Sequence, residues 1–388
     1  MKRIIDLGMH SYADTFISKT QLGVNEPVYP LQCFLDQKTG HVTLGHKTDS
    51  NERYNLYDYS YTSSNSKFAR NHWDSYAKNT VNKTTINQGK ILEIGSNDGY
   101  LSNQYQKLGF EVLGVDPSKY IAKIAEKNGV KTYCDIFDYN TSNAIKSKHG
   151  KFDMVVANNV FNHSNDPIDF AKGVKNILDD QGVFIFEVPY WYNTIKDRRF
   201  DQIYHEHPNY FTVKSACNLL KESGLCVYDV EWVDYHGGSI RVYAQKHISP
   251  SLYINDNVFK FINKEEKEEL FKVETYVKYM RDIKIQRAQR LSSLYNFSQF
   301  FPIVGVGAAA KGNTFLNFYN LDYTILDYIT DASEHKIGKY TPLSRIPIMD
   351  DETVFKKYNT VGALILSWNI SDILKEKLKL INDKIIFL

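Results

Sequence analysis

The stretch Ile91-Leu-Glu-Ile-Gly-Ser-Asn-Asp-Gly-Tyr100 decides the fold. A short apolar run that carries one acid, Glu93, leads directly into a turn that contains Gly95 and Gly99. Glycine lets the backbone turn tightly and approach a ligand closely, and the amides of a following helix lie near such a turn. The segment therefore predicts a strand, a ligand-binding loop and a helix.

The rhythm of the sequence around this loop indicates a βαβ sheet. Short apolar runs that alternate with helical segments lie at residues 91–94, 111–115, 154–157 and 183–187, with further strand candidates at 226–232 and 240–244. A second alternating series lies at residues 302–307, 325–329, 361–366 and 384–388. It predicts a second doubly wound α/β unit.

The remaining segments complete a prediction of three parts. Residues 1–80 are irregular with short extended pieces and predict a small accessory lobe, followed by a sheet domain at residues 81–246. The charged stretch 264–290 has apolar residues at helical spacing, so residues 247–388 are predicted to be a helical linker and the second α/β domain. The predicted fold class is therefore α/β, with two Rossmann-like sheets.

Composition excludes several classes of protein. The 388 residues are 43% hydrophobic and 24% charged, which argues against disorder or a disulfide-stapled miniprotein. The net charge of +2 is too small to predict binding to nucleic acid or membrane by bulk electrostatics. The four cysteines lie apart, and no apolar run approaches a membrane span. We expect a cytoplasmic protein, monomeric or homodimeric.

Polar residues after the first loop favour a nucleoside ligand. Asp116 lies 23 positions after Glu93 at the end of the next apolar run, where it can accept hydrogen bonds from both ribose hydroxyls. Asp135 and Ile136 offer an adenine amine an acceptor and apolar contact, and Asn158 follows a later strand. The alternative is a plain βα turn with Asp116 as a helix cap.

The spacing E-x-G-x-x-x-G differs from the G-x-G-x-x-G of a dinucleotide site. It resembles motif I of the class I S-adenosylmethionine-dependent methyltransferases, and the resemblance extends over residues 86–190. It implies S-adenosylmethionine as cofactor, with Asp116 on the ribose. The residues that it places around the cofactor are Glu93, Gly95, Asn97, Gly99, Asp116, Asp135, Ile136 and Asn158.

Residues 200–211 contain a concentration of groups that can move protons. Tyr204, His205, Glu206 and His207 are consecutive. Histidine takes up a proton near neutral pH, tyrosine can donate to a developing oxyanion, and glutamate can orient an imidazole. Geometry alone does not choose between His205 and His207, and a metal site or an aromatic cluster remains an alternative.

A second polar group lies in Tyr235-His-Gly-Gly-Ser-Ile-Arg241. Its small residues between His236 and Arg241 allow a bulky polar ligand to approach. Arg241 could pair with a phosphate or with Glu206. The alternative is a glycine bulge before a strand.

Six segments together resemble the sugar C-methyltransferases, which act on nucleotide-activated 4-keto sugars. They lie at residues 58–66, 93–99, 158–163, 200–207, 236–241 and 309–314, with Glu187-Val-Pro between them. They occur in the order typical of the family and span nearly the whole chain. The resemblance implies an enzyme of branched-chain sugar biosynthesis that methylates the carbon beside a ketone, C3 of a dTDP- or GDP-linked sugar.

The family resemblance also assigns roles to residues. His207 is implied as the base, with Tyr204 near the keto oxygen, Glu206 supporting the imidazole, and Tyr61 reaching the sugar. The residues implied to bind substrate are Tyr59, Ser63, His236 and Arg241. In the second α/β domain, Lys311, Asn313 and Thr314 beside helix amides suit a pyrophosphate.

One departure from the family concerns zinc. Members usually carry a cysteine-rich zinc module at the N-terminus, whereas this chain has Asp6, Leu7 and His10 in that region and Cys33 as the one cysteine of the lobe. We therefore expect no zinc and no other metal. The lobe is then predicted to be held by ordinary packing.

Three other functions remain open. An O- or N-methyltransferase would need only a hydroxyl or an amine in place of the acidic carbon. An NAD-dependent sugar oxidoreductase would use the second glycine loop, Gly305 to Gly312, although its spacing is imperfect. A sugar-nucleotide binding protein without catalysis is the third.

Overall fold

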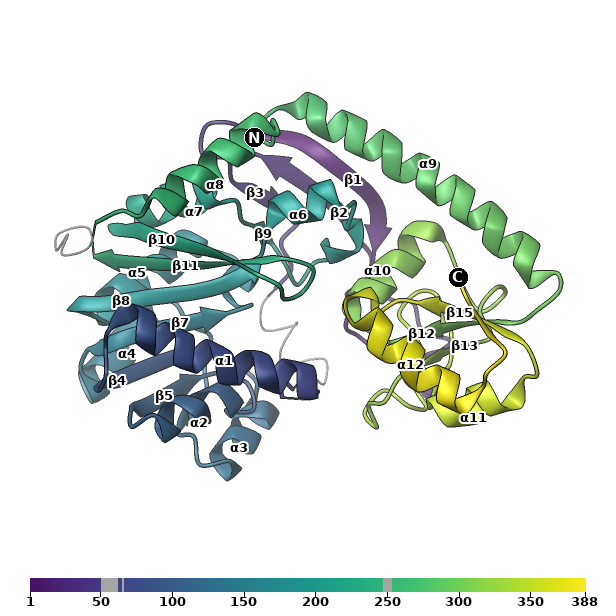
Figure 1. Ribbon diagram of the computed structural model, residues 1–388, viewed down its shortest axis with the longest axis horizontal. Helices are drawn as coiled ribbons and strands as arrows, with labels where there is room; N and C mark the ends of the chain where they lie inside the picture. The colour runs from purple at the N-terminus through teal and green to yellow at the C-terminus, as the bar shows by residue number, and fades with distance from the viewer. Residues whose placement is uncertain (50–61, 65, 247–252) are drawn as a thin grey trace.

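The structure is a computed structural model that describes residues 1–49, 62–64, 66–246 and 253–388. These residues form three sheets, of four, seven and five strands. The four-stranded and seven-stranded sheets lie on one side of the molecule and the five-stranded sheet on the other (Figure 1). Within the described residues, no helix combines the length and apolarity needed to span a bilayer.

The seven-stranded sheet has the order β10-β11-β8-β7-β4-β5-β6. Its strands are β4 (Lys90–Ile94), β5 (Glu111–Val115), β6 (Thr132–Tyr133), β7 (Phe152–Asn158), β8 (Leu178–Pro189), β10 (Leu225–Val233) and β11 (Ser239–Lys246). All neighbours are parallel except β11, which is antiparallel to both β8 and β10. The carboxyl ends of β4, β5, β6 and β7 therefore meet at one edge.

Helices cover both faces of this sheet, which explains its nearly continuous apolar strands. On one face, α1 (Lys67–Thr84) and α2 (Tyr100–Lys107) pack against Ile91 of β4. On the other, α4 (Tyr139–His149), α5 (Pro167–Ile177) and α7 (Val213–Glu222) lie side by side against Leu92. The first α/β prediction is thereby confirmed, with α3 (Lys119–Lys127) following β5.

The four-stranded sheet is antiparallel and has the order β1-β2-β3-β9. Its strands are β1 (Lys2–His10), β2 (Tyr29–Leu35), β3 (Val42–Leu44) and β9 (Asn209–Tyr210). The first 80 residues are thus more regular than the sequence indicated. Register shifts within β1 interrupt the alternation of buried and exposed residues that normally reveals a strand.

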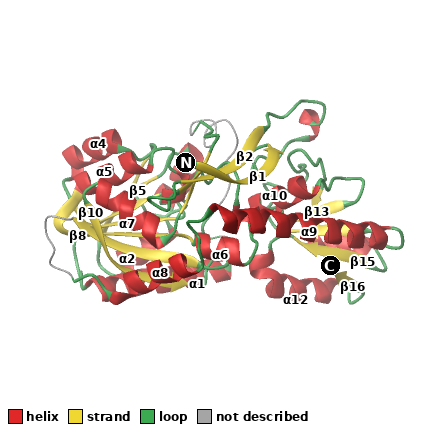
Figure 2. Cartoon of the chain, turned by 90° about the horizontal axis from the view of Figure 1, so that it is seen from above, coloured by secondary structure: helices red, strands yellow, loops and turns green. Residues whose placement is uncertain are grey.

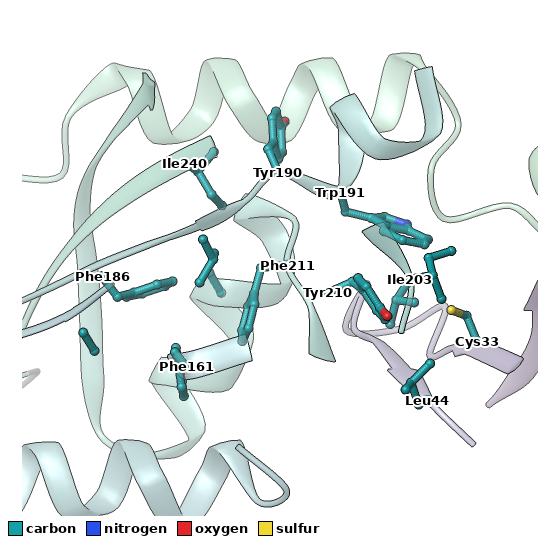
Figure 3. Packing of buried hydrophobic residues seen from close by; sticks show 14 of the residues in the cluster. Cys33, Leu44, Phe161, Phe186, Tyr190, Trp191, Ile203, Tyr210, Phe211 and Ile240 are labelled. Atoms are coloured by element: carbon teal, nitrogen blue, oxygen red, sulfur yellow. The ribbon is translucent and has the colours of Figure 1, made fainter. Parts of the chain in front are cut away.

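Strand β9 belongs to the segment that follows Tyr204 and His207, so the first sheet and the proton-moving segment share one core. Figure 3 shows Trp191, Ile203 and Tyr210 beside Cys33 and Leu44. The rings of Trp191 and Tyr210 lie 4.9 Å apart. The lobe therefore supports this segment directly, together with the short helix α6 (Trp191–Lys196).

The five-stranded sheet is fully parallel and has the order β14-β13-β12-β15-β16. Its strands are β12 (Ile303–Val306), β13 (Tyr328–Thr330), β14 (Ile348–Met349), β15 (Val361–Ile365) and β16 (Ile385–Phe387). Its helices are α10 (Ala310–Tyr319), α11 (Asp351–Lys357) and α12 (Ser371–Ile381). The predicted second Rossmann-like unit is confirmed.

Two connections join this sheet to the rest. Helix α8 (Asp256–Lys267) leads to α9 (Val273–Ser298), which runs from the first sheet along the outside of the last one (Figures 1 and 2). The segment between β1 and β2 also contacts the C-terminal unit, where Ile17 pairs with Tyr340 in a β-bridge. Glu26 forms an ion pair with Arg345 at 3.0 Å. The segment between β1 and β2 therefore contacts the C-terminal unit as well as continuing from the first sheet.

Candidate active site

The glycine loop after β4 forms a cradle that only glycine can line. Gly95 has φ +70°, and a Cβ atom there would lie 2.1 Å from Cγ2 of Val160. Gly99, the N-cap of α2, has φ +79°, and its Cβ would lie 2.8 Å from Cγ2 of Val130. Both conditions exclude a side chain at these two positions, so a ligand can approach the backbone of the loop closely there.

Two carboxyl groups stand beside this loop. Asp116 accepts hydrogen bonds from the backbone N–H groups of Asn97 (3.1 Å) and Ser118 (2.9 Å), and burial raises its pKa to about 6. Glu93 is buried inside β4, accepts a hydrogen bond from the Ser102 hydroxyl, and has its pKa raised by burial to about 8. The two acids are therefore held by the loop and by α2.

The other predicted cofactor residues lie at the same edge of the sheet. Asp135 and Ile136 follow β6, and Asn158 is the last residue of β7. Both amide atoms of the Asn158 side chain are buried and have no hydrogen-bond partner among the described residues. An orphaned amide beside a glycine cradle is what a polar ligand would satisfy. The residues therefore fit S-adenosylmethionine.

The structure brings Tyr204 and His207 together. The Tyr204 hydroxyl lies 2.8 Å from Nε2 of His207, and Nδ1 of His207 lies 3.3 Å from the backbone oxygen of Gln202. A carbonyl oxygen can only accept, so Nδ1 donates to Gln202, which in a neutral imidazole leaves Nε2 to accept from Tyr204. The imidazole is thus held in the tautomer of a base.

The structure also separates His207 from His205, which the sequence could not do. The ring of His205 is buried in the first lobe, near the rings of Tyr12 (6.4 Å), Tyr29 (5.8 Å) and His46 (6.2 Å). Burial lowers its pKa to about 4. His205 therefore packs within the lobe, and His207 takes the position beside Tyr204.

His163 is a neighbour of this pair that the sequence analysis did not assign. It ends the 3-10 helix Phe161–His163 after β7, and its ring lies 4.7 Å from the ring of His207. The signal was present, because His163 is the last residue of the segment 158–163 that carried part of the family resemblance.

Glu206 has a structural contact of its own. Its Oε1 accepts a hydrogen bond from the backbone N–H of Asp14 at 3.1 Å. The carboxylate thus holds the segment between β1 and β2 against the loop of Tyr204 and His207. Its predicted support of the imidazole stays a prediction.

Arg241 lies elsewhere than expected. Its guanidinium donates to Oε2 of Glu187 from Nε (2.9 Å) and from one terminal nitrogen (2.8 Å), and it covers the ring of Tyr76 at 4.4 Å. Both charged residues are buried, because Arg241 of β11 stands opposite Glu187 of β8 in the sheet. The expected pairing with a phosphate or with Glu206 is replaced by this internal ion pair.

His236 and its glycines connect the sheet domain to the C-terminal unit. The backbone oxygen of His236 accepts from Nε2 of Gln202 at 2.6 Å. A Cβ atom on Gly237 would lie 2.5 Å from the ring of Trp368. Burial, with the charge of Lys311, lowers the pKa of His236 well below its usual range.

Of the three predicted pyrophosphate residues, Lys311 lies at this junction. Its Nζ donates to Oδ1 of Asn369 and lies 4.8 Å from the ring of Trp368, and burial lowers its pKa to about 8. Asn313 is buried and donates to the backbone oxygen of Ala13 at 2.6 Å. Thr314 is also buried and bonds within α10. Those two thus have internal hydrogen bonds, and their predicted role at a pyrophosphate stays a prediction.

A pocket of about 480 Å³ adjoins the junction. Arg199 lies 3.5 Å above the ring of Trp368, whose indole N–H donates to Asp201. Further charged and aromatic side chains that line the pocket are Arg198, Arg290, Lys375, Phe315, Tyr319 and Phe387. No local pattern predicted this pocket, because its lining comes from five separate segments of the chain.

The remaining predicted residues belong to the lobe. Tyr59 and Tyr61 lie outside the described residues. Ser63 donates from its backbone N–H to Oδ1 of Asn97 at 2.8 Å, so it touches the cofactor loop. In the part of the chain that the structure describes, no three His, Cys, Asp or Glu side chains are arranged to hold a metal ion.

Known proteins are similar to this chain in both halves. A family profile described as "Methyltransferase domain" matches residues 69–230, and one described as "C-methyltransferase C-terminal domain" matches residues 234–386. The C-methyltransferase NovU of Streptomyces niveus is 27% identical over 368 residues, which cover 94% of this chain and 87% of that protein.

Other similarities cover less of the chain. The putative methyltransferase YqeM of Bacillus subtilis is 29% identical over 105 residues, which cover 26% of this chain and 42% of that protein. A solved S-adenosylmethionine-dependent methyltransferase from Clostridium acetobutylicum is 17% identical, with a TM-score of 0.38, and the match covers 47% of this chain and 93% of that one.

Proposed function

We propose that this chain, which belongs to the S-adenosylmethionine-dependent C-methyltransferases, methylates a carbon next to the ketone of a nucleotide-linked 4-keto sugar. The family, the enzyme class and the cofactor are confirmed by the two profile matches and by the similarity to NovU over nearly the whole chain. The nucleotide, the ketone and C3 as the methylated carbon are the proposal.

The observation that carries the chemistry is the hydrogen bond between Tyr204 and His207. A proton next to a ketone is weakly acidic, so a base and an oxyanion donor must act together. With substrate present, the Tyr204 hydroxyl turns from Nε2 to the keto oxygen, and Nε2 is then free to take the proton from C3. The electron pair of the broken C–H bond moves to the keto oxygen as an enolate.

S-adenosylmethionine, when bound, supplies an electrophilic methyl group on a sulfonium. The chain's residues hold the enolate facing it: Tyr204 donates to the oxygen, and the imidazolium of His207 lies close enough to balance its charge. His163, 4.7 Å from the His207 ring, limits the room in which that ring can move. The proton finally leaves His207 for solvent.

Positive side chains support a diphosphate on the substrate. Lys311 and Arg199 flank the ring of Trp368, and Arg290 lines the adjoining pocket. Guanidinium groups suit phosphate oxygens, and the aromatic lining suits a nucleobase. Gln202 connects this region to the base: its side chain donates to the backbone oxygen of His236, and its backbone oxygen faces Nδ1 of His207. Gly237, next to His236, lies against Trp368. These groups suit a ligand whose sugar lies near His207 and whose nucleotide lies near Trp368.

The test is incubation of the protein with labelled S-adenosylmethionine and a panel of dTDP- and GDP-linked 4-keto sugars in deuterated water. The expected product carries the label on carbon, and the unreacted substrate exchanges its C3 proton for deuterium. A methylated product that retains this proton would instead indicate O- or N-methylation. Hydride transfer to NAD without any labelled product would favour an oxidoreductase.

Other parts of the interpretation stay predictions. They are the bounds of the three domains, the cytoplasmic location, the place in branched-chain sugar biosynthesis, and a monomeric or homodimeric state. Gel filtration with light scattering tests the last of these.

A further inference from the structure

We infer that Asp98 is a positioning residue that couples the cofactor loop to the segment before helix α1. It lies in the loop between Gly95 and Gly99, and its side chain is buried. The coupling means that cofactor binding stabilises the position of Ser63 and Ser64. The physical coupling is independent of the acceptor, whereas its effect on substrate rests on the proposed function.

The carboxylate of Asp98 accepts hydrogen bonds from three groups of this segment. Its Oδ1 accepts from the Ser63 hydroxyl at 2.8 Å. Its Oδ2 accepts from the backbone N–H of Ser64 at 3.1 Å and from the Ser64 hydroxyl at 2.6 Å. An ionised carboxylate is the side chain that can accept all of these without offering a donor in return.

The neighbouring residue connects the same segment to the ribose side of the site. Oδ1 of Asn97 accepts from the backbone N–H of Ser63 at 2.8 Å, while the backbone N–H of Asn97 donates to Asp116 at 3.1 Å. Asn97 itself has φ +49°, in the left-handed region that asparagine adopts more readily than most residues. The loop is thus fixed from both sides.

Helix α1 connects this segment to Tyr235, the residue before His236. The Trp73 indole N–H donates to the backbone oxygen of Ser63 at 3.2 Å. His72, which precedes Trp73 in the same helix, forms a hydrogen bond with Glu187 at 2.7 Å. Its ring stacks on that of Tyr235, with centroids 3.8 Å apart. Tyr235 precedes the His236 loop. Shifting Ser63 would therefore disturb a helix that touches the predicted sugar end of the site.

Binding of the cofactor and seating of the serine segment both order the glycine loop. A bound cofactor restricts the glycine loop, and a restricted loop presents Asp98 to the serines at a smaller entropic cost. By linkage, a correctly seated serine segment must then raise cofactor affinity by the same factor. Asp98 is proposed to act through the serines and not on the reacting atoms of cofactor or substrate, so its role is positional.

The experiment measures hydrogen exchange in peptides that cover residues 62–73, with and without S-adenosylhomocysteine. We expect the cofactor product to slow exchange at Ser63 and Ser64 by about tenfold in the unaltered protein. In Asp98→Asn, which offers a donor where an acceptor is needed, we expect less than about twofold slowing. Ser64→Ala, which keeps the carboxylate, should give an intermediate value.

Asp153→Asn is the matched control. Asp153 also accepts a backbone N–H bond, from Lys90 at 2.7 Å, but at the amino end of β4. It should leave the cofactor-dependent slowing intact even if stability falls. Equal slowing in Asp98→Asn, or no slowing in the unaltered protein, would overturn the inference. Failure to methylate any keto sugar would count against the proposed function alone.

With an accepted sugar in hand, Asp98→Asn also has a kinetic signature. The KM for the sugar should rise by about tenfold when the cofactor is saturating, while kcat changes less. A purely structural role would lower the melting temperature and the active fraction without changing KM.

Discussion

The hydroxyl of Tyr204 lies 2.8 Å from Nε2 of His207, while Nδ1 of the same ring faces the backbone oxygen of Gln202. The two contacts fix the tautomer, the ring orientation and the side from which a proton can be taken. In the proposed reaction, Nε2 of His207 takes the proton of the carbon acid, and the Tyr204 hydroxyl donates to the oxygen that becomes negative.

His207→Asn should abolish transfer while leaving the cofactor bound. Asparagine keeps a polar side chain but cannot take up a proton, so turnover should fall by about 10²–10⁴-fold. S-adenosylhomocysteine affinity, measured by calorimetry, should change by less than about threefold, because His207 lies outside the glycine loop. Turnover within tenfold of the unaltered protein would remove His207 as the base.

His205→Ala should give the opposite pattern. The ring fills a buried place among Tyr12, Tyr29 and His46, so its loss should cost about 2–4 kcal/mol of folding free energy. Urea unfolding measures this cost. The kcat of the folded fraction should stay within about threefold, since the imidazole next to Tyr204 is intact. A specific loss of kcat at unchanged stability would contradict the separation of the two histidines.

Cofactor affinity should depend on the charge of Asp116. Its pKa is raised to about 6 by burial, so the carboxyl is ionised above that pH and protonated below it. Ribose hydroxyls donate best to the ionised form, and affinity for S-adenosylhomocysteine should therefore fall by up to about tenfold per pH unit below 6. Calorimetry from pH 5 to 8 measures it. Asp116→Asn should bind weakly and should lose the fall in affinity below pH 6.

Lys311 predicts a pH dependence at the alkaline end. Burial lowers its pKa to about 8, so its positive charge is present below that pH and is lost above it. The KM for a nucleotide-linked sugar should rise as pH increases through 8, because a diphosphate then loses a charged partner. Lys311→Arg should remove this rise, since guanidinium stays charged. The same rise in Lys311→Arg would assign it to another group.

Gly95→Ala tests the cradle. The new Cβ would lie 2.1 Å from Val160 on a backbone with φ +70°, so both binding of the cofactor and stability should suffer. We expect a loss of about 2–4 kcal/mol. Gly109→Ala is the control, because its φ of +94° is also positive but nothing lies within 4 Å of its Cβ. It should cost about 1–2 kcal/mol.

The double variant Gly95→Ala, Val160→Ala separates contact from backbone strain. Removing the valine methyls should restore part of the stability, to about the level of Gly109→Ala. Thermal unfolding and calorimetry with S-adenosylhomocysteine measure the two effects. No recovery would show that the clash with Val160 is not the cause.

Local patterns in the sequence were enough to identify both Rossmann-like units, because parallel strands covered on two faces must be short apolar runs separated by helices. The glycine loop could be identified for a related reason: Gly95 and Gly99 stand where the backbone has positive φ, and few residues tolerate that conformation. Such requirements act within a few residues and leave a mark on the chain itself.

The partners of polar side chains were beyond such reasoning. His205 and His207 are two residues apart, yet one packs into the lobe and the other meets Tyr204. The sequence suggested Arg241 as a phosphate ligand, but its guanidinium pairs with the carboxylate of Glu187 on the neighbouring strand β8. Pairing of β8 with β11 decided the second outcome, and packing of distant rings around His205 decided the first.

By itself, then, the chain determined its layers, its cofactor loop and the short list of groups able to move a proton. Tertiary structure alone decided which of those groups meet, because the desolvation of a buried charge or imidazole is set by whatever packs against it in space. Asp98 illustrates the difference: its place in the loop is local, whereas the serines that it holds come from another part of the fold.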